Sequence, residues 1–157
     1  MTDFTLPRKY ATLALLFGLT MFFSASVQLV TWGLDRRVPF ELINYHVNEA
    51  QAGDAIIIRG NVKRDLSRSC TLMYSRVFYD STGARFELTK EPQLMTAGAL
   101  ADLNERLPDT LLLNITVPPL AAPGAAAVVS ALQYECNPVH KLYPLNMLVT
   151  FNVTVLP

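Results

Sequence analysis

Four side chains in this sequence belong to the types that bind transition metals or carry out thiol chemistry: His46, Cys70, Cys136 and His140. Zinc sites and thiol oxidoreductases usually hold such residues in close pairs, as in C-x-x-C or H-x-x-x-H. Neither spacing occurs here. We therefore predict no metal site, no redox centre and no cofactor, and we expect His140, which lies beside Lys141, to be a solvated loop residue.

The sequence also lacks the patterns that carry hydrolytic or phosphate chemistry. It contains neither the G-x-S-x-G elbow of hydrolases nor the H-E-x-x-H of metalloproteases. No two of its seven glycines form a G-x-G, so no glycine-rich phosphate loop is present. The carboxylates are scattered along the chain. We predict that the protein is not an enzyme, and we identify no small-molecule substrate.

The length and the charge of the chain limit its number of domains and the kinds of partner it can bind. The chain has 157 residues, of which 51% are hydrophobic and 17% charged, and its formal net charge is zero. This length allows one domain with an appendage. A neutral chain lacks the basic face that nucleic-acid recognition needs. We therefore expect no nucleic-acid partner.

One segment is long and apolar enough to cross a membrane. Residues 10–34 contain no Asp, Glu, Lys, Arg or His, and about 20 apolar residues suffice to span the hydrocarbon layer as a helix. We predict a transmembrane signal-anchor here. Basic and aromatic residues are typical of the two interfaces, and those expected there are Arg8, Lys9, Tyr10, Trp32, Arg36 and Arg37.

Two questions about this segment stay open. Its small residues Ser24-Ala25-Ser26 also fit a signal peptide that is cleaved near Ser26, which would release a secreted protein. Basic residues flank both ends, so the positive-inside rule barely discriminates between orientations. A short basic N-terminal tail is typical of a signal-anchor in the inner membrane, with the C-terminal domain on the periplasmic or extracytoplasmic side.

The remaining chain is predicted to be one β domain. We divide the chain into a tail at 1–9, the membrane helix at 10–34, a linker at 35–39 and a domain at 40–157. Alternating and β-branched residues predict strands at 40–47, 54–63, 70–79, 84–88, 110–117, 125–136 and 147–156. About seven antiparallel strands with short connections are typical of a β-sandwich.

Three local features refine this prediction. Residues 80–83 (D-S-T-G) are typical of a hairpin turn. Gly60 inside a strand indicates a bulge or a close approach of backbone. Residues 95–107 place leucines on one helical stripe and predict a short helix or ordered loop, bounded by Pro92 and Pro108.

The last third of the chain is almost free of charge. From residue 110 onward only Glu135 and Lys141 are charged. One interpretation is that these residues form core strands. The other is an apolar surface that faces a partner or a second copy of the chain, because large apolar patches usually mark contacts.

Tyr134-Glu135-Cys136, with Cys70 at the start of an earlier strand, resembles the Y-x-C pattern of immunoglobulin-like domains. The resemblance implies a Cys70–Cys136 bridge between two sheets and a tyrosine corner at Tyr134. The family's core tryptophan is missing, since the only tryptophan is Trp32, and Phe78 or Phe86 are the candidates for its volume. Two buried free thiols are the alternative to the bridge.

Two strings are similar to small bitopic envelope proteins of bacteria and phages. They are V-F-Y-D-S-T-G-A-R-F at 77–86 and Y-E-C-N-P at 134–138. This resemblance implies a fold and a location, but no reaction.

These observations together predict a membrane-anchored, non-enzymatic interaction or structural protein. Its partners would be lipid, through residues 10–34, and a protein partner or a homo-oligomer. We expect contacts at Asn137, Pro138, His140 and Tyr143. The alternative is a phage- or mobile-element-encoded envelope factor in lysis, superinfection control or virion assembly.

Overall fold

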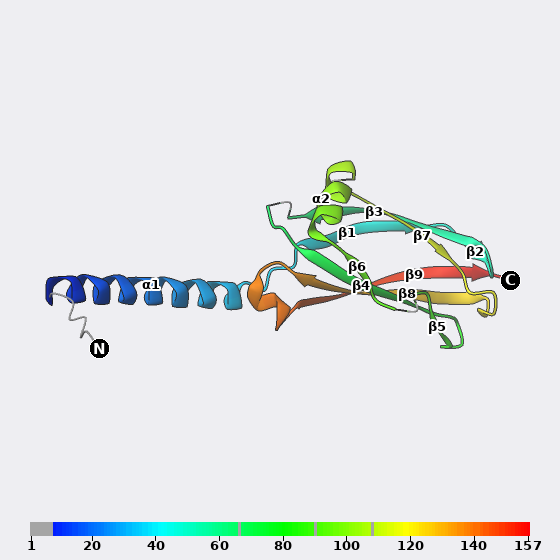
Figure 1. The fold of residues 1–157 in the computed structure, drawn as a ribbon. Coiled ribbons are helices and arrows are strands. Elements are labelled where there is room, and N and C mark those ends of the chain that lie inside the picture. Colours follow the sequence, from blue (N-terminus) through cyan, green and yellow to red (C-terminus); the bar gives the residue numbers. More distant parts are fainter. Residues whose placement is uncertain (1–7, 66, 90, 108) are drawn as a thin grey trace. The chain divides into compact units, whose positions relative to one another are not determined.

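The computed structural model describes residues 8–65, 67–89, 91–107 and 109–157, with Arg8 and Lys9 described by their backbone alone. The chain divides after Arg36 into two compact units. The first contains a single helix, and the second, 37–157, contains all the strands (Figure 1). The first seven residues of the predicted tail lie outside the described part.

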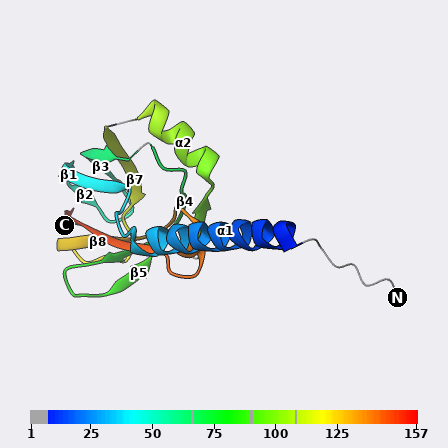
Figure 2. The same ribbon diagram turned by 90° about the vertical axis from the view of Figure 1, so that its left-hand side faces the viewer.

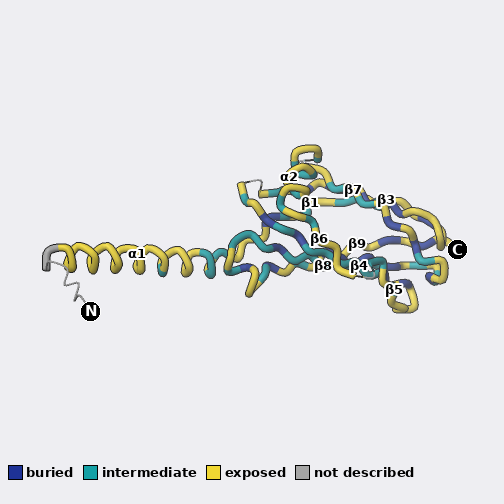
Figure 3. The backbone as a smooth tube through the Cα atoms, in the orientation of Figure 1, coloured by how far each residue is buried: buried dark blue, intermediate teal, exposed yellow. Residues whose placement is uncertain are grey.

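The first unit is the helix α1, Arg8–Leu34, which covers the predicted span and begins two residues earlier. Its stretch Tyr10–Leu34 is long and apolar enough to cross a membrane, and none of its most apolar window is buried inside the protein (Figure 3). Hydroxyl groups within the span donate to the helix's own carbonyls, Thr20 to Leu16 at 2.7 Å for example. Internal bonding of this kind suits a helix in lipid, where water cannot supply the partner.

Over its described residues, the second unit is built from nine strands in two sheets. The smaller sheet has the order β1-β3-β7, with β1 at Phe40–Val47, β3 at Ala55–Arg64 and β7 at Thr110–Thr116. The larger sheet has the order β2-β9-β8-β4-β5, and β6 also pairs with β4. Its strands are β2 (Ala50–Gln51), β4 (Thr71–Tyr79), β5 (Arg85–Glu87), β6 (Gln93–Met95), β8 (Gly124–Glu135) and β9 (Leu145–Leu156). In the view of Figure 2, β1, β3 and β7 of the smaller sheet lie above β8 and β5 of the larger one.

The seven predicted strands are all present, with bounds that differ by two residues or fewer. The two additional strands are β2 and β6, which contain two and three residues. A run this short cannot display a period of two, so sequence patterning missed both. β2 pairs with β9 in parallel, whereas the other strand pairs are antiparallel.

The predicted helix is α2, Ala97–Arg106, between β6 and β7. Thr96 caps its N-terminus by accepting a hydrogen bond from the Ala99 N–H, as Thr commonly does at this position. Pro108, the predicted C-terminal boundary, lies outside the described residues. None of the α2 side chains is fully buried, so the helix lies on the surface of the domain.

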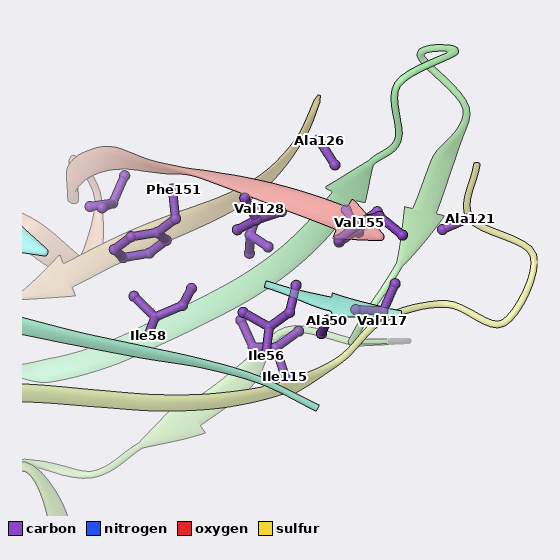
Figure 4. Close-up of a cluster of buried hydrophobic side chains, with 13 residues drawn as sticks. Ala50, Ile56, Ile58, Ile115, Val117, Ala121, Ala126, Val128, Phe151 and Val155 are labelled. Atoms are coloured by element: carbon purple, nitrogen blue, oxygen red, sulfur yellow. The ribbon is translucent and has the colours of Figure 1, made fainter. Parts of the chain in front are cut away.

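The core lies between the two sheets and follows from strict alternation along the strands. Ile56 and Ile58 of β3 contribute from one side, and Val128 and Phe151 contribute from the other (Figure 4). Phe78 of β4 belongs to the same cluster. Phe78 is fully buried and meets Phe86 edge-on, with ring centroids 6.3 Å apart. Of the two candidates for the volume of a core tryptophan, Phe78 therefore lies in the core, and the partly buried Phe86 packs against that core from the edge strand β5.

The backbone of β1 passes close to Gly60, as the position of this glycine inside a strand predicted. The pairing of β1 with β3 shifts register between Leu42 and Asn44, next to the pair that Tyr45 forms with Gly60. A Cβ atom added at Gly60 would lie 2.6 Å from the Asn44 carbonyl oxygen, closer than any real side chain sits. Glycine is needed here because the bulged strand leaves no room for a side chain.

Cys70 and Cys136 form a disulfide, with their Cα atoms 4.0 Å apart. The bridge differs from the one that the immunoglobulin resemblance implied. Cys70 immediately precedes β4 and Cys136 immediately follows β8, and Thr71 pairs with Glu135 across these neighbouring strands. The bridge therefore joins two adjacent strands of one sheet, so the expectation of a bridge between sheets is wrong. Sequence spacing sets the loop length but not which strands become neighbours.

Candidate functional site

The predicted contact loop forms a short helical turn, η1, at Pro138–Lys141. The Asn137 side-chain oxygen accepts hydrogen bonds from the backbone N–H groups of Val139 and His140, at 3.0 and 3.1 Å. This cap turns the chain so that the His140 side chain points inward. Pro138 and Tyr143 are exposed, and Asn137 is partly exposed.

His140 is only 1% exposed, so the prediction of a solvated contact residue is wrong. Its Nδ1 lies 3.4 Å from the Cys136 N–H, within hydrogen-bonding distance, and its Nε2 lies 3.2 Å from the Asn137 amide nitrogen. Buried polar side chains are retained where they find such partners. His140 therefore supports the turn from inside, and of the four predicted contact residues it is the one removed from the surface.

The residues predicted to lie at the membrane interface are found at the ends of α1 or next to them. Tyr10 and Trp32 lie near the two ends of α1, and Arg36 and Arg37 follow its C-terminus. Their contact with headgroups stays a prediction. Tyr134, the predicted corner tyrosine, lies at the end of β8, whereas the family pattern places this residue near the start of a strand. Its corner role also stays a prediction.

The outer face of the larger sheet is the first candidate site. On β9, residues facing the core alternate with exposed ones, and the outward residues of this strand are all uncharged. Leu148, one of them, is 72% exposed. A groove of about 600 Å³ crosses this face, lined by Met73, Ser75, Ala131, Gln133, Asn146 and Leu148 among others. The charge-poor third of the chain thus contributes to both the core and the surface. That its surface faces a partner or a second copy stays a prediction.

The second candidate site is a cavity of about 180 Å³ between the two sheets. Both sheets and α2 contribute to its wall, which is mostly apolar. The apolar residues that line it include Phe40, Leu72, Met95, Leu103, Leu113 and Phe151. Ligand sites typically combine such apolar walls with a few polar groups.

Arg76 and Ser130 are the polar groups that face one another in this cavity. They pair directly across β4 and β8, on the face that carries Phe78 and Val128 into the core. Ser130 is 3% exposed, and neither its Oγ nor Arg76 Nε has a hydrogen-bond partner among the described residues. The Arg76 guanidinium lies 4.7 Å from the centre of the Tyr74 ring. This cation–π contact compensates in part for the charge, and Tyr74 also favours it through a side-chain hydrogen bond.

A second arginine, Arg64, lines the cavity, and two of its donors already have partners in the protein. The Arg64 guanidinium donates to the carbonyl oxygen of Leu107 and to that of Thr110, the latter at 3.2 Å. Burial raises the pKa of the neighbouring Tyr134 phenol to about 12, so this side chain is neutral. Arg64 therefore lines the wall with two of its N–H groups already hydrogen-bonded, and Tyr134 lines it with a neutral side chain.

Burial also lowers the pKa of Arg76, while the nearby Tyr74 acts in the opposite direction. Arginine nevertheless stays protonated in proteins, because its ordinary pKa is above 12. Arg76 lies on the same face of β4 as Leu72 and Phe78, but we did not identify it as a site residue from the sequence. The charge on an otherwise apolar face was the available signal.

No known protein family matches this chain, and no curated protein is significantly similar to it in sequence.

Proposed function

We propose that this protein is a single-pass, membrane-anchored, non-enzymatic interaction protein whose β domain lies on the extracytoplasmic side. The anchor is α1, with its exposed apolar stretch Tyr10–Leu34. The Cys70–Cys136 bridge supports the extracytoplasmic side, because disulfides persist in oxidising compartments and are rare in the cytosol.

We further propose that the domain is an immunoglobulin-like sandwich in its architecture. Two mainly antiparallel sheets pack over a shared apolar core, which supports this assignment. The bridge within one sheet and the position of Tyr134 depart from the family pattern. The proposal therefore concerns the architecture and not the family's conserved core.

The observation that carries the proposed function is the scarcity of charge on the outer face of β4, β8 and β9. Among the described residues of these strands, Glu135 at the end of β8 is the one charged side chain on this face. Small, apolar and uncharged polar side chains line the groove, such as Ala131, Leu148 and Gln133. The depletion of charge is also what distinguishes the centre of a protein interface from ordinary surface. The occupant would be a protein partner or a second copy of the chain.

Photo-crosslinking of the full chain in native membranes tests this proposal. A photoreactive residue at Leu148 should give a defined product of higher mass. The same residue at Leu112, an exposed leucine on the smaller sheet, is the matched control and should give little product. Leu148→Asp should abolish the product in chains that carry the crosslinker at Gln133. Monomer alone from every position on the outer face would refute the proposal.

The same cells address the alternative of an envelope factor that acts on the membrane itself. Such a factor should arrest growth on expression, and the arrest should persist in Leu148→Asp but disappear when a charge is placed in α1. Growth arrest that instead depends on Leu148 would favour the interaction protein.

A further inference from the structure

We propose that the cavity between the sheets binds one small amphipathic monocarboxylate, with its carboxylate on Arg76 and Ser130 and its apolar body against the wall that includes Leu113 and Phe151. This site is separate from the outer face, and it does not depend on the function proposed above.

The charge in the cavity is the first argument. Burying even part of a cation without a counter-ion is costly. The Arg76 side chain is partly buried, and its Nε atom is fully buried. None of the described residues that line the cavity is acidic. Tyr74 covers one face of the Arg76 guanidinium, but Nε remains without a hydrogen-bond partner among the described residues. A bound anion would supply the missing partner.

The geometry of the donors indicates a carboxylate. The guanidinium of Arg76 presents a planar fork, which matches the two oxygens of a carboxylate. Ser130 lies directly opposite Arg76 in the β4–β8 ladder, and its hydroxyl can donate a further hydrogen bond. Arg64 is engaged with the carbonyls of Leu107 and Thr110. The charge of Arg64 also lies near Asp109, which leaves Arg76 as the guanidinium of this cavity without an acidic neighbour among the described residues. One such charge matches a monoanion better than a phosphate dianion.

The volume and walls define the rest of the ligand. The cavity measures about 180 Å³. An apolar cavity of about 150 Å³ in another protein is known to bind benzene. The apolar body of the ligand should therefore be somewhat larger than benzene, which corresponds to a short aliphatic chain or a single substituted ring. A full-length lipid chain would not fit.

Calorimetric titration with octanoate tests the site, using the full chain in lipid nanodiscs and empty nanodiscs as the blank. We expect saturable binding of one octanoate per chain. The neutral analogue 1-octanol should bind at least tenfold more weakly, because it cannot form the ion pair with Arg76. Hexadecanoate should not compete with octanoate.

Three variants separate the proposed role from a structural one. Arg76→Met keeps an unbranched side chain of similar length, and it should weaken octanoate binding tenfold to a hundredfold. Ser130→Ala should weaken it severalfold. Arg85→Met removes an exposed charge of the same sheet, paired with Glu87, and should leave binding unchanged.

The melting temperature of the ligand-free protein completes the test. Replacing a buried unpaired charge by an apolar residue is often neutral or stabilising, so Arg76→Met should melt no lower than the wild type. The proposal is overturned if the wild type binds no octanoate, if Arg76→Met binds it equally well, or if 1-octanol binds as tightly as octanoate.

Discussion

Asp80 shows how one side chain organises a turn. The residue is 7% exposed, and its Oδ1 accepts hydrogen bonds from the N–H groups of Thr82 and Ala84, each at 2.9 Å, and from the Thr82 hydroxyl. Its Oδ2 accepts another from Ala122, on the segment before β8. The hydrogen bond from the Thr82 hydroxyl makes the largest contribution and, with that from Ala122, lowers the pKa of Asp80 to about 2.

This network predicts a pH-dependent contribution to stability. The ordinary pKa of Asp is about 3.9. Because the folded value is lower, the contribution is complete above about pH 4 and is lost as the pH falls towards 2. Asp80→Asn should therefore lower the melting temperature by several degrees at pH 7, and the difference from wild type should shrink near pH 2.

Thermal unfolding of both proteins across this pH range is the measurement. Asp54→Asn, in an exposed turn of the same domain, is the matched control and should behave like the wild type at each pH. A difference between Asp80→Asn and wild type that stays constant down to pH 2 would contradict this explanation.

At the scale of elements, the disulfide fixes the ends of two neighbouring strands. It closes a loop between residues 66 positions apart, joining the start of β4 to the end of β8. In the chain-entropy model, closing a loop of this length stabilises the fold by about 4 kcal/mol. Because both ends belong to one sheet, the bridge does not hold the two sheets together.

Replacing Cys70 and Cys136 by Ala should lower the free energy of unfolding by about 4 kcal/mol. Amide exchange should rise mainly at the Thr71–Glu135 end of the β4–β8 pair, with the opposite end of the sheet less affected. A reductant should destabilise the wild type and leave the double variant unchanged. Wild-type thiols that react with an alkylating reagent without reductant would contradict the bridge.

The elements themselves were largely predictable, because their periodicity is local. The predicted strands at 40–47 and 110–117 match β1 and β7 closely, and residues 97–106 of the predicted helix form α2. The parallel pairing of β2 with β9 was not predictable, because Ala50 and Val155 meet only after the whole domain has folded.

At the scale of the whole molecule, the chain combines a helix suited to lipid with a domain that has its own core. Phe22 lies at the middle of Tyr10–Leu34 and is 73% exposed. An arginine at the centre of a membrane helix costs about 2.5–3.5 kcal/mol in insertion. Phe22→Arg should therefore markedly lower the fraction of protein that resists alkaline extraction of membranes, whereas Phe22→Leu should leave it unchanged.

The intact mass of the extracted protein decides between the two fates of this segment. An uncleaved anchor retains its first residues, whereas a processed protein would begin near Ser26. Equal extraction of Phe22→Arg and Phe22→Leu would contradict anchoring by α1.

Sequence alone determined the features that depend on neighbours along the chain: the apolar span 10–34, the strand periodicity and the helix near residue 100. Proximity of Cys70 and Cys136 was only implied by a resemblance, and their place in one sheet depended on strand order. Tertiary structure also decided that His140 turns inward and that Arg76 meets Ser130 in a cavity. The physical reason is that burial and partners depend on which strands become neighbours, and contacts between residues far apart in the chain set that order.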